Sequence, residues 1–401
     1  MASSAPKVAE AERFETPDEV DRKAQTLADL IRKSKHFIAV TGAGVSTSAG
    51  IPDFRGPDGA WTLRAQGRQR TSKVTNTLQA IATPTHMALV ELQNRGFLKY
   101  LISQNCDGLH RKSGILPERI SELHGNSNRE YCKDCGKEYI RDFRAVATYE
   151  KTVHDHRTGR KCTVCGGPLL DTIVNFDEFL AAEPLERAYE NAKKADLCLV
   201  LGSSCTIPPS NKMPEIVGKK KSANLAICNL QSTPLDHLST LRIFTKTDGL
   251  MMRVMEKLDI PIPPFILHRR LLVKFEKNQL VVSGVDVDGT PATFLQSVKV
   301  EYNRRVARSE PFVVNFRGEL DSGTELKLEL EFMGHYGEPN LEIVYEYRKE
   351  DDKHTLYLLN YNPLTGEWKT SKQSDPAGDD VEKEPTPVVN PVPEIEYIII
   401  D

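Results

Sequence analysis

Hydrophobic residues near the start of the chain recur with the spacing of one helix face. They lie four, three and four positions apart: Val20, Ala24, Leu27 and Ile31. Thr16-Pro17 precedes this segment and is typical of a helix cap followed by a first-turn proline. A continuous apolar run at 37–41 comes next and stops at a glycine-rich turn. The pattern therefore predicts a helix, a strand and a glycine turn, in that order.

Three later segments repeat the short apolar run that ends in small or polar residues. They span 100–103, 197–201 and 225–228, and helix-length segments separate them. Such spacing is typical of a parallel sheet with helices on both faces. Because the carboxyl ends of parallel strands meet at one edge of the sheet, the polar residues that follow them predict a ligand crevice there. The expected fold is a Rossmann-like α/β domain.

The second half of the chain changes to a period of two. Alternate positions from 326 to 332 are apolar and the positions between them are charged, as in a strand with one buried face. The same alternation returns at 341–345, and turn signals separate these runs. We therefore expect a separate all-β, sandwich-like domain at 265–370.

The remaining segments complete the expected domain organisation. A polar stretch at about 128–170 interrupts the α/β pattern and indicates a small inserted module. The α/β domain, with this insertion, is expected to span 18–264, where prolines mark its end. Residues 1–17 are expected to form a flexible N-terminus, and residues 371–401 an acidic, proline-rich tail.

Composition places the chain among soluble globular proteins, with 39% hydrophobic residues, 27% charged residues and a net charge of −3. No segment approaches the roughly 18 consecutive apolar residues of a transmembrane helix, so no membrane partner is expected. Residues 371–401 carry two basic and eight acidic residues, which disfavours nonspecific nucleic-acid binding through this tail. The basic run 219–221 leaves direct nucleic-acid binding open.

Four of the eight cysteines form two C-x-x-C pairs inside the polar insertion: Cys132, Cys135, Cys162 and Cys165. Four thiolates suit one tetrahedral Zn²⁺ ion, and a closed ligand set leaves no place for a reacting water. We therefore expect one structural zinc ion. Two disulfides are the alternative, and they are disfavoured in a reducing compartment.

The glycine turn at 41–46 is by itself a weak signal for binding phosphate through backbone amides. A dinucleotide-binding dehydrogenase fingerprint needs a third glycine at position 47, where this chain has Thr47. A hydride-transferring dehydrogenase is therefore disfavoured.

Further motifs follow the turn in a fixed order: GIPDFRG at 50–56, QNCDGLH at 104–110, LHGN at 123–126, GSS at 202–204 and NLQ at 229–231. With them the sequence resembles the sirtuins, NAD-dependent protein-lysine deacylases. The resemblance covers about 18–263, is strongest to class IV and its sirtuin 7 type, and does not extend to the β-domain.

The resemblance implies the roles of particular residues. His124 is the expected general base, because a neutral imidazole accepts a ribose hydroxyl proton near neutral pH. Asn105 is the second expected catalytic residue. NAD is expected to bind to residues of the glycine turn, of the motifs that follow it, and of their neighbours. These residues are Gly42, Ala43, Gly44, Ser46, Asp53, Phe54, Arg55, Trp61, Gln104, Asn105, Asp107, Gly202, Ser203, Ser204, Asn229, Leu230, Gln231 and Thr247.

The implied function is a deacylase that transfers the acyl group of a modified lysine to ADP-ribose and releases nicotinamide. Histones and other nuclear proteins are the implied substrates, and the nucleus, or its nucleolus, is the implied location, with the cytoplasm as the alternative. The β-domain is expected to contact chromatin or another protein partner, or to act only as a brace on the α/β domain. The alternative function is an interaction protein that senses NAD or ADP-ribose and has weak deacylase or mono-ADP-ribosyltransferase activity.

One position departs from the family pattern. Asp177 stands where the family usually has glycine, in the loop that pairs with the substrate backbone. Its side chain restricts the backbone angles and adds negative charge beside the acyl-lysine groove, which affects peptide affinity and acyl preference.

Overall fold

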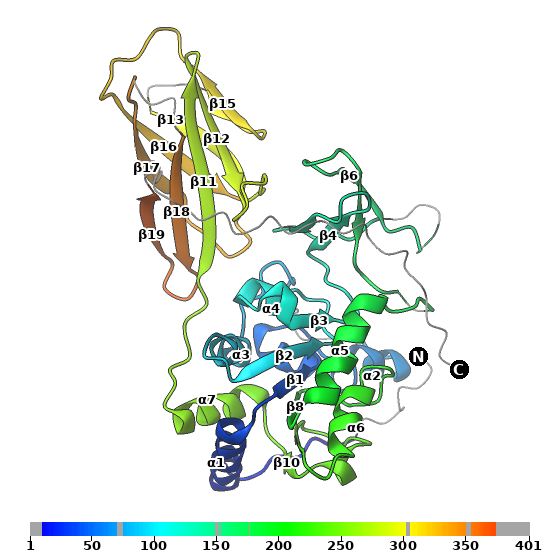
Figure 1. Cartoon of the computed structure of the whole chain (residues 1–401). Coiled ribbons are helices and arrows are strands. Elements are labelled where there is room, and N and C mark those ends of the chain that lie inside the picture. Colours follow the sequence, from blue (N-terminus) through cyan, green and yellow to red (C-terminus); the bar gives the residue numbers. More distant parts are fainter. Residues whose placement is uncertain are drawn as a thin grey trace.

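The computed structural model describes residues 10–69, 75–148, 152, 154–175, 177–301, 305–349 and 354–373. Residues 1–9 of the expected flexible N-terminus and residues 374–401 of the expected acidic tail lie outside this part. Figure 1 shows a parallel sheet with its helices at one end of the molecule, a β-sandwich at the other, and a small four-stranded sheet beside them.

The central sheet is parallel and has the strand order β10-β9-β8-β1-β2-β3. Its strands are β1 (Phe37–Thr41), β2 (Leu98–Ser103), β3 (Ile120–Glu122), β8 (Leu197–Leu201), β9 (Asn224–Cys228) and β10 (Leu241–Ile243). The chain builds outward from β1 to β3 and then returns to build from β8 to β10 on the other side. The order therefore reverses between β1 and β8, where a doubly wound sheet forms its ligand crevice.

Helices cover both faces of this sheet. One face carries α1 (Pro17–Lys33), α3 (Pro84–Asn94) and α7 (Thr247–Leu258), and the other carries α5 (Ala182–Lys194) and α6 (Lys212–Gly218). Two short helices, α2 (Ala60–Ala65) and α4 (Leu109–Ser113), lie in connections at the carboxyl edge. None of the helices in the described ranges has the length and apolar character needed to cross a membrane.

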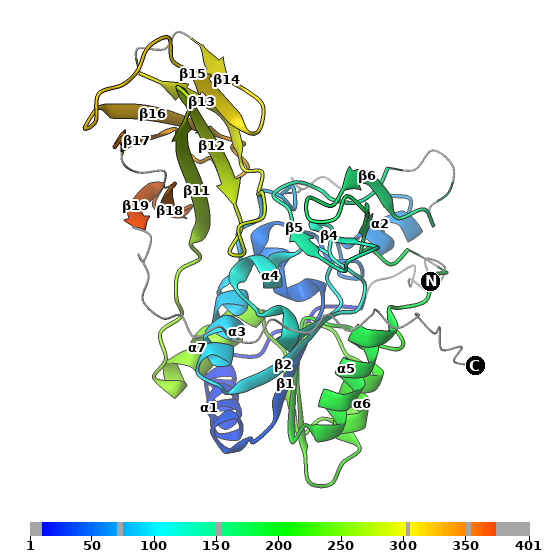
Figure 2. The ribbon, with the colours of Figure 1, turned by 45° about the horizontal axis from the view of Figure 1, so that its top comes forward.

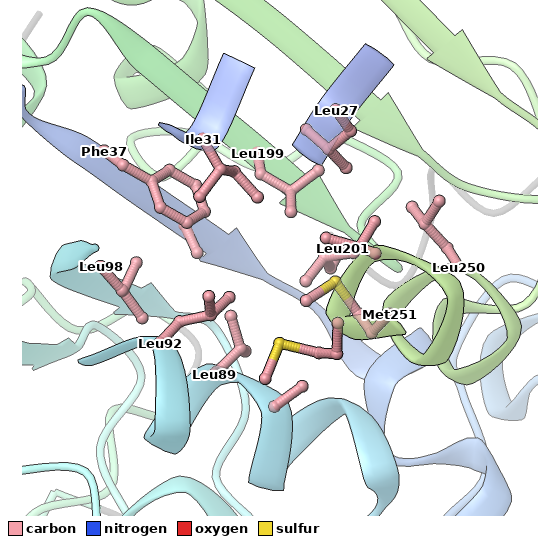
Figure 3. Packing of buried hydrophobic residues seen from close by; sticks show 14 of the residues in the cluster. Leu27, Ile31, Phe37, Leu89, Leu92, Leu98, Leu199, Leu201, Leu250 and Met251 are labelled. Carbon is pink, nitrogen blue, oxygen red and sulfur yellow. The ribbon is translucent and has the colours of Figure 1, made fainter. Parts of the chain in front are cut away.

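The sequence pattern of α1 explains why it packs here. Its apolar positions are buried, and Thr16 accepts a hydrogen bond from the Glu19 amide at 3.3 Å to cap its first turn. Figure 3 shows Leu27 and Ile31 of this helix facing Leu199 and Phe37 of the sheet and Met251 of α7. Full burial of one such side chain stabilises the fold by about 1.5–3 kcal/mol.

The segment that precedes α1 forms backbone hydrogen bonds with loops that are distant in the sequence. The Arg13 amide donates to the Leu230 carbonyl at 2.8 Å, and the Glu15 amide donates to the Phe244 carbonyl at 2.9 Å. Backbone hydrogen bonds thus hold residues 10–16 against the loops that follow β9 and β10. The apolar periodicity used to locate the helix carries no information about such backbone contacts.

The insertion between β3 and α5 forms a separate antiparallel sheet with the order β5-β4-β7-β6. Its strands are β4 (Arg129–Cys132), β5 (Glu138–Ile140), β6 (Arg157–Lys161) and β7 (Pro168–Asp171). We call this unit the cysteine module. Its small core contains two of the cysteines together with Tyr139 and Leu169.

The C-terminal strands form a sandwich of two antiparallel sheets, with the orders β15-β12-β11-β18-β19 and β14-β13-β16-β17 (Figure 2). Their bounds are β11 (Leu267–Glu276), β12 (Gln279–Val285), β13 (Leu295–Val300), β14 (Val306–Ala307), β15 (Phe312–Asn315), β16 (Glu325–Phe332), β17 (Leu341–Glu346), β18 (Thr355–Asn362) and β19 (Glu367–Gln373). The expected fold class, a Rossmann-like domain with a small inserted module and an all-β domain, is confirmed.

The sandwich contacts both other parts of the chain. Phe265, Leu267 and Tyr361 pack against Ala82 and Met87 of the α/β domain. Arg269 of β11 forms an ion pair of 2.8 Å with Asp142 of the cysteine module, and both side chains are largely buried. The sandwich is therefore docked on the α/β domain and the cysteine module together.

Candidate active site

Two glycine turns meet at the point where the strand order reverses. The Gly44 amide donates to the Gly202 carbonyl at 2.9 Å, which joins the turn after β1 to the turn after β8. A Cβ atom on Gly44 would lie 2.6 Å from the Gly202 Cα atom, closer than backbone atoms allow. Glycine is therefore required because the backbones of the two turns touch.

A single cavity of about 1290 Å³ opens at this edge of the sheet. Every residue for which the sequence predicted a catalytic or NAD-binding role lines it: Gly42, Ala43, Gly44, Ser46, Asp53, Phe54, Arg55, Trp61, Gln104, Asn105, Asp107, His124, Gly202, Ser203, Ser204, Asn229, Leu230, Gln231 and Thr247. These residues come from segments as far apart in the sequence as Gly42 and Thr247. The parallel topology brings them together.

Asp107 and Asn105 tie the turns after β1 and β2 to each other. One carboxylate oxygen of Asp107 accepts a hydrogen bond from the Ser46 hydroxyl at 2.7 Å, and the other accepts from the Leu109 amide at 2.9 Å. The Asn105 side-chain amide donates to the Gly42 carbonyl at 3.0 Å. Both side chains therefore fix the conformation of the glycine turn as well as lining the cavity.

His124 follows β3 and is oriented by one backbone group. Its Nδ1 lies 2.9 Å from the Gln104 carbonyl oxygen. Because a carbonyl only accepts hydrogen bonds, Nδ1 carries the proton and Nε2 keeps its lone pair. Burial lowers the pKa of the imidazole, and the hydrogen bond to Gln104 opposes this shift. His124 is therefore neutral at neutral pH, and the lone pair of its Nε2 can accept a proton.

The segment 53–61 forms a wall of the cavity. The Ala60 amide donates to the Asp53 carbonyl at 3.0 Å, and the Gly56 amide donates to the Asp53 carboxylate at 3.1 Å. Phe54 is 48% exposed and stacks on Trp61 with ring centroids 5.8 Å apart. The hydrogen bonds hold the loop in a compact shape, and the aromatic pair presents an apolar surface to the cavity.

The loops after β9 and β10 bound the cavity at its other end. The Asn229 side chain donates to the Gln231 carbonyl at 2.9 Å, and the Gln231 side-chain amide donates to the Glu10 carbonyl at 2.6 Å. The Thr247 hydroxyl donates to the Gly44 carbonyl at 3.5 Å. The Gln231 side chain thus links the cavity to the N-terminal segment.

The segment after β7 lines the cavity on the side of His124. The Val174 amide donates to the His124 carbonyl at 3.2 Å. Asp177, the residue at the expected glycine position, has a φ of 67° in the left-handed region. Asp tolerates this conformation better than most residues, although it costs roughly 1 kcal/mol more than glycine. The substitution therefore retains the glycine-like backbone and adds a carboxylate at the cavity.

The sequence reasoning missed several residues that line the cavity. Asp248 lies in the first turn of α7 and accepts hydrogen bonds from the Thr85 amide at 3.0 Å and from the Ser48 hydroxyl at 2.5 Å. Its place just after an apolar strand is a signal that the strand-end rule provides. Glu12 and Arg144 also line the cavity. They lie outside the strand ends, and their sequence surroundings contain no comparable signal.

The four cysteines predicted to bind metal converge at one point of the cysteine module. Their sulfur atoms all lie within 4.8 Å of one another, with Cys132 and Cys165 at 3.4 Å and Cys135 and Cys162 at 3.7 Å. Thiolates about 2.3 Å from a tetrahedral ion are separated by about 3.8 Å, whereas a disulfide is near 2.0 Å. The donor set therefore fits one structural Zn²⁺, and all four cysteines are free of disulfides.

The chain is similar in sequence to a known family and to several known proteins. The model of the Sir2 family matches residues 68–209. The NAD-dependent protein deacetylase SRT1 of Arabidopsis thaliana is 38% identical over 357 residues, which cover 80% of this chain and 74% of that protein. The NAD-dependent protein deacetylase sirtuin-7 of Bos taurus is 40% identical over 265 residues, which cover 62% of this chain and 63% of that protein.

Two further matches complete the picture. The NAD-dependent protein deacetylase Sirt6 of Drosophila melanogaster is 38% identical over 260 residues, covering 63% of this chain and 81% of that protein. A solved structure of Sir2Tm bound to a propionylated peptide is 30% identical and covers 60% of this chain and all of that chain, with a TM-score of 0.45.

The match to the Arabidopsis protein corrects one expectation. The sequence motifs limited the resemblance to residues before the sandwich. A match over 80% of the chain is longer than residues 1–264 and therefore includes part of the sandwich. Short motifs mark catalytic loops, whereas a β-sandwich is held by apolar alternation that many sequences share. The identity of this relative and the share of it that the chain covers show the family: the chain belongs to the Sir2 family, the sirtuins, which are NAD-dependent protein deacylases.

Proposed function

We propose that the protein removes acyl groups from lysine side chains of nuclear proteins, with histones as the first candidates, and that His124 is its general base. The orientation of His124 carries this proposal. The Gln104 carbonyl holds Nδ1 protonated, so that the lone pair of Nε2 is available for a proton within the cavity. A general base in this position contributes about 10²–10⁴-fold to the rate.

The other residues of the cavity support the same chemistry. The touching turns at Gly44 and Gly202 let phosphate groups approach backbone amides without meeting a Cβ atom. NAD, when bound, supplies the sugar carbon that receives the acyl oxygen and the nicotinamide that leaves. Asn105 and Asp107 hold the glycine turn against the loop after β2, and the Gln104 carbonyl of that loop orients His124.

Water exclusion is the task of the aromatic wall. Phe54 and Trp61 lie on the cavity as a stacked pair, and Phe54 remains half exposed. An apolar surface beside the reacting sugar carbon keeps competing water away until the acyl oxygen of the substrate is in place.

Product analysis with full-length protein tests the proposal. The protein is incubated with NAD and a panel of acyl-lysine histone peptides, and nicotinamide and 2′-O-acyl-ADP-ribose are measured by mass spectrometry. We expect both products from the wild type and a loss of about 10²–10⁴-fold in His124→Ala. The control is His268→Ala, which removes an exposed histidine of the sandwich that contacts Asn360. NAD binding without either product would instead favour the sensor function.

The nuclear location and the role of the sandwich are inferred from the resemblance to class IV sirtuins. A fluorescent fusion of the full chain should accumulate in the nucleus. Binding of the full chain to nucleosomes, compared with binding of its substrate peptides alone, tests whether the sandwich contacts chromatin. Equal affinity for nucleosomes and for isolated histone peptides would count against this partner.

A further inference from the structure

Two histidines of the cysteine module form a chain of hydrogen bonds with two acidic residues. His156 lies between carboxylates, with Nδ1 at 2.8 Å from Asp171 and Nε2 at 3.0 Å from Glu178. His154 contacts the same oxygen of Glu178 through its Nδ1 at 2.7 Å. Asp171 is fully buried and Glu178 is 14% exposed, so both carboxylates are shielded from solvent. The histidine–carboxylate cluster therefore has shielded carboxylates, whereas His154 is half exposed.

Each carboxylate of this cluster also holds the backbone of the segment that lines the cavity. Asp171 accepts from the Ile173 amide at 3.1 Å, and Glu178 accepts from the Asn175 amide at 2.6 Å. Between these two points, the Val174 amide is bound to the carbonyl of His124. The segment 173–175 is thus held by hydrogen bonds to the histidine–carboxylate cluster and to the backbone of His124.

The position of this segment indicates which substrate it serves. The glycine turns that suit the pyrophosphate lie between β1 and β8, whereas the segment 173–175 lies beside His124 and belongs to the connection between the cysteine module and α5. Phe179 extends the same wall and is 59% exposed. Because the acyl-lysine substrate must reach His124, we expect it to lie along the wall formed by the segment 173–175 and Phe179.

We propose that His156 is a positioning residue for the acyl-lysine substrate: by bridging Asp171 and Glu178 it holds the segment 173–175 in the shape that binds the substrate peptide. This inference rests on the proposed deacylase function. His156 does not touch the reacting atoms, so its loss acts on the affinity for the peptide and leaves the proton transfer to His124 intact.

The bridge depends on protonation. Only the imidazolium form donates from both ring nitrogens, whereas neutral histidine turns one lone pair toward a carboxylate. Burial lowers the pKa of His156, but the hydrogen bonds to Asp171 and Glu178 outweigh it, so that the pKa is raised overall. The other charged groups around His156 are His154, which shares Glu178, and Asp155, which is paired with Arg157. The bridge is therefore complete at lower pH and weakens as pH rises through the raised pKa.

Steady-state kinetics of the full-length protein test this role. The KM for an acyl-lysine peptide, the KM for NAD and kcat are measured from pH 6 to pH 9 for the wild type, His156→Gln and the control His268→Gln. We expect His156→Gln to raise the peptide KM about tenfold near pH 6.5, which corresponds to the loss of one charge-assisted hydrogen bond. Its NAD KM and kcat should stay within about twofold, and its zinc content should be unchanged.

The pH profile separates this role from general loosening of the fold. In the wild type, the peptide KM should rise with pH while the NAD KM stays flat, and in His156→Gln the peptide KM should be high and independent of pH. An unchanged peptide KM in His156→Gln, or the same pH slope in both proteins, would overturn the inference. If His156→Gln loses zinc or unfolds, a wild-type peptide KM that is flat with pH overturns it alone. An inactive wild type would refute the proposed function instead.

Discussion

The α/β domain with its cysteine module and the C-terminal sandwich differ in what they bury. Among the described residues, nearly all buried polar side chains lie before position 250, including Asp107, His110, Glu122 and Glu130. In the sandwich the one buried polar side chain of the described residues is Ser297. Its other interior positions are apolar and alternate with charged residues, as in β16. The two regions thus use different interiors within one chain.

The difference shows that an interior with polar groups needs hydrogen bonds that an apolar interior does not need. A buried polar group stays folded only if hydrogen bonds replace its lost hydration. The α/β domain meets this need with networks such as Asp107 with Ser46 and Leu109. In the described part of the sandwich the buried residues are mainly apolar, and the one buried polar side chain, Ser297, donates a hydrogen bond to Glu331. The first region is therefore sensitive to charge and metal, whereas the second is sensitive to packing.

The largest expected effect is removal of zinc, which should damage only the first region. Structural zinc sites contribute roughly 10–16 kcal/mol to the folding of zinc-finger peptides. β7 ends at Asp171 and leads directly into the segment 173–175, which lines the cavity. Chelation of zinc or Cys132→Ser should therefore abolish deacylation. Hydrogen exchange resolved by peptide should show the cysteine module open and the sandwich protected. Full activity of the zinc-free protein would show that the first region does not depend on the metal.

A packing change should affect the second region instead. Leu328 of β16 is fully buried in the sandwich core. Leu328→Ala should lower the free energy of unfolding of the sandwich by about 2–5 kcal/mol, measured by denaturant titration, with kcat unchanged. The neighbouring Lys327→Ala alters a side chain that is 48% exposed and should cost less than about 0.5 kcal/mol. A comparable loss of kcat in Leu328→Ala would show that the two regions do not act separately.

A buried acid should make the stability of the first region depend on pH between about 4.5 and 7. Burial raises the pKa of Glu122 to about 7, although Arg129 and Arg111 oppose the shift. The folded protein therefore keeps a proton on Glu122 that the unfolded chain has already lost above its ordinary value of 4.5. The contribution of this group to stability thus falls as pH rises toward 7.

Removing this titration gives a direct measurement. Glu122→Gln keeps the shape of the protonated acid and should stabilise the α/β domain by about 1–3 kcal/mol at pH 8, with little effect at pH 5. Thermal unfolding at the two pH values measures the change. Glu183→Gln alters a side chain that is 71% exposed and should show no pH-dependent difference. Stabilisation that is equal at both pH values would exclude the protonation argument.

The smallest expected effect concerns the contact between the two regions. Arg269 and Asp142 form an ion pair of 2.8 Å with side chains 11% and 19% exposed. A double-mutant cycle with Arg269→Ala and Asp142→Ala should give a coupling energy of about 1 kcal/mol. Limited proteolysis between α7 and β11 measures the docking of the sandwich. The ion pair of Lys137 with Asp288, which is more exposed, should show a smaller coupling.

The local parts of this structure were accessible from the sequence. Apolar spacing predicted α1, β1, β8 and β16, because burial of one face imposes a period on the sequence. The cysteine pairs predicted the metal cluster, since the ligand spacing within each pair is local. The backbone hydrogen bonds of residues 10–16 were not accessible, because they reach partners more than 200 positions away.

The candidate site was only partly accessible for the same reason. Residues in motifs, such as His124 and Asp107, follow strands and were found. Glu12 and Arg144 reach the cavity from segments without a motif. His154 and His156 stand in a polar stretch whose pattern indicates no partner. Their role depends on Glu178, which is 22 positions beyond His156 and faces it only after β6 and β7 have paired.

The sequence by itself determined where the chain is apolar, where it turns and which chemical groups stand at the ends of its strands. Only the tertiary structure decided which of those groups meet. Gly44 touches Gly202 because β1 pairs with β8, and that pairing depends on apolar contacts shared among many helices and strands. Secondary structure follows from local periodicity. The geometry of the site follows from the summed packing energy of the whole domain, which no local segment of the sequence contains.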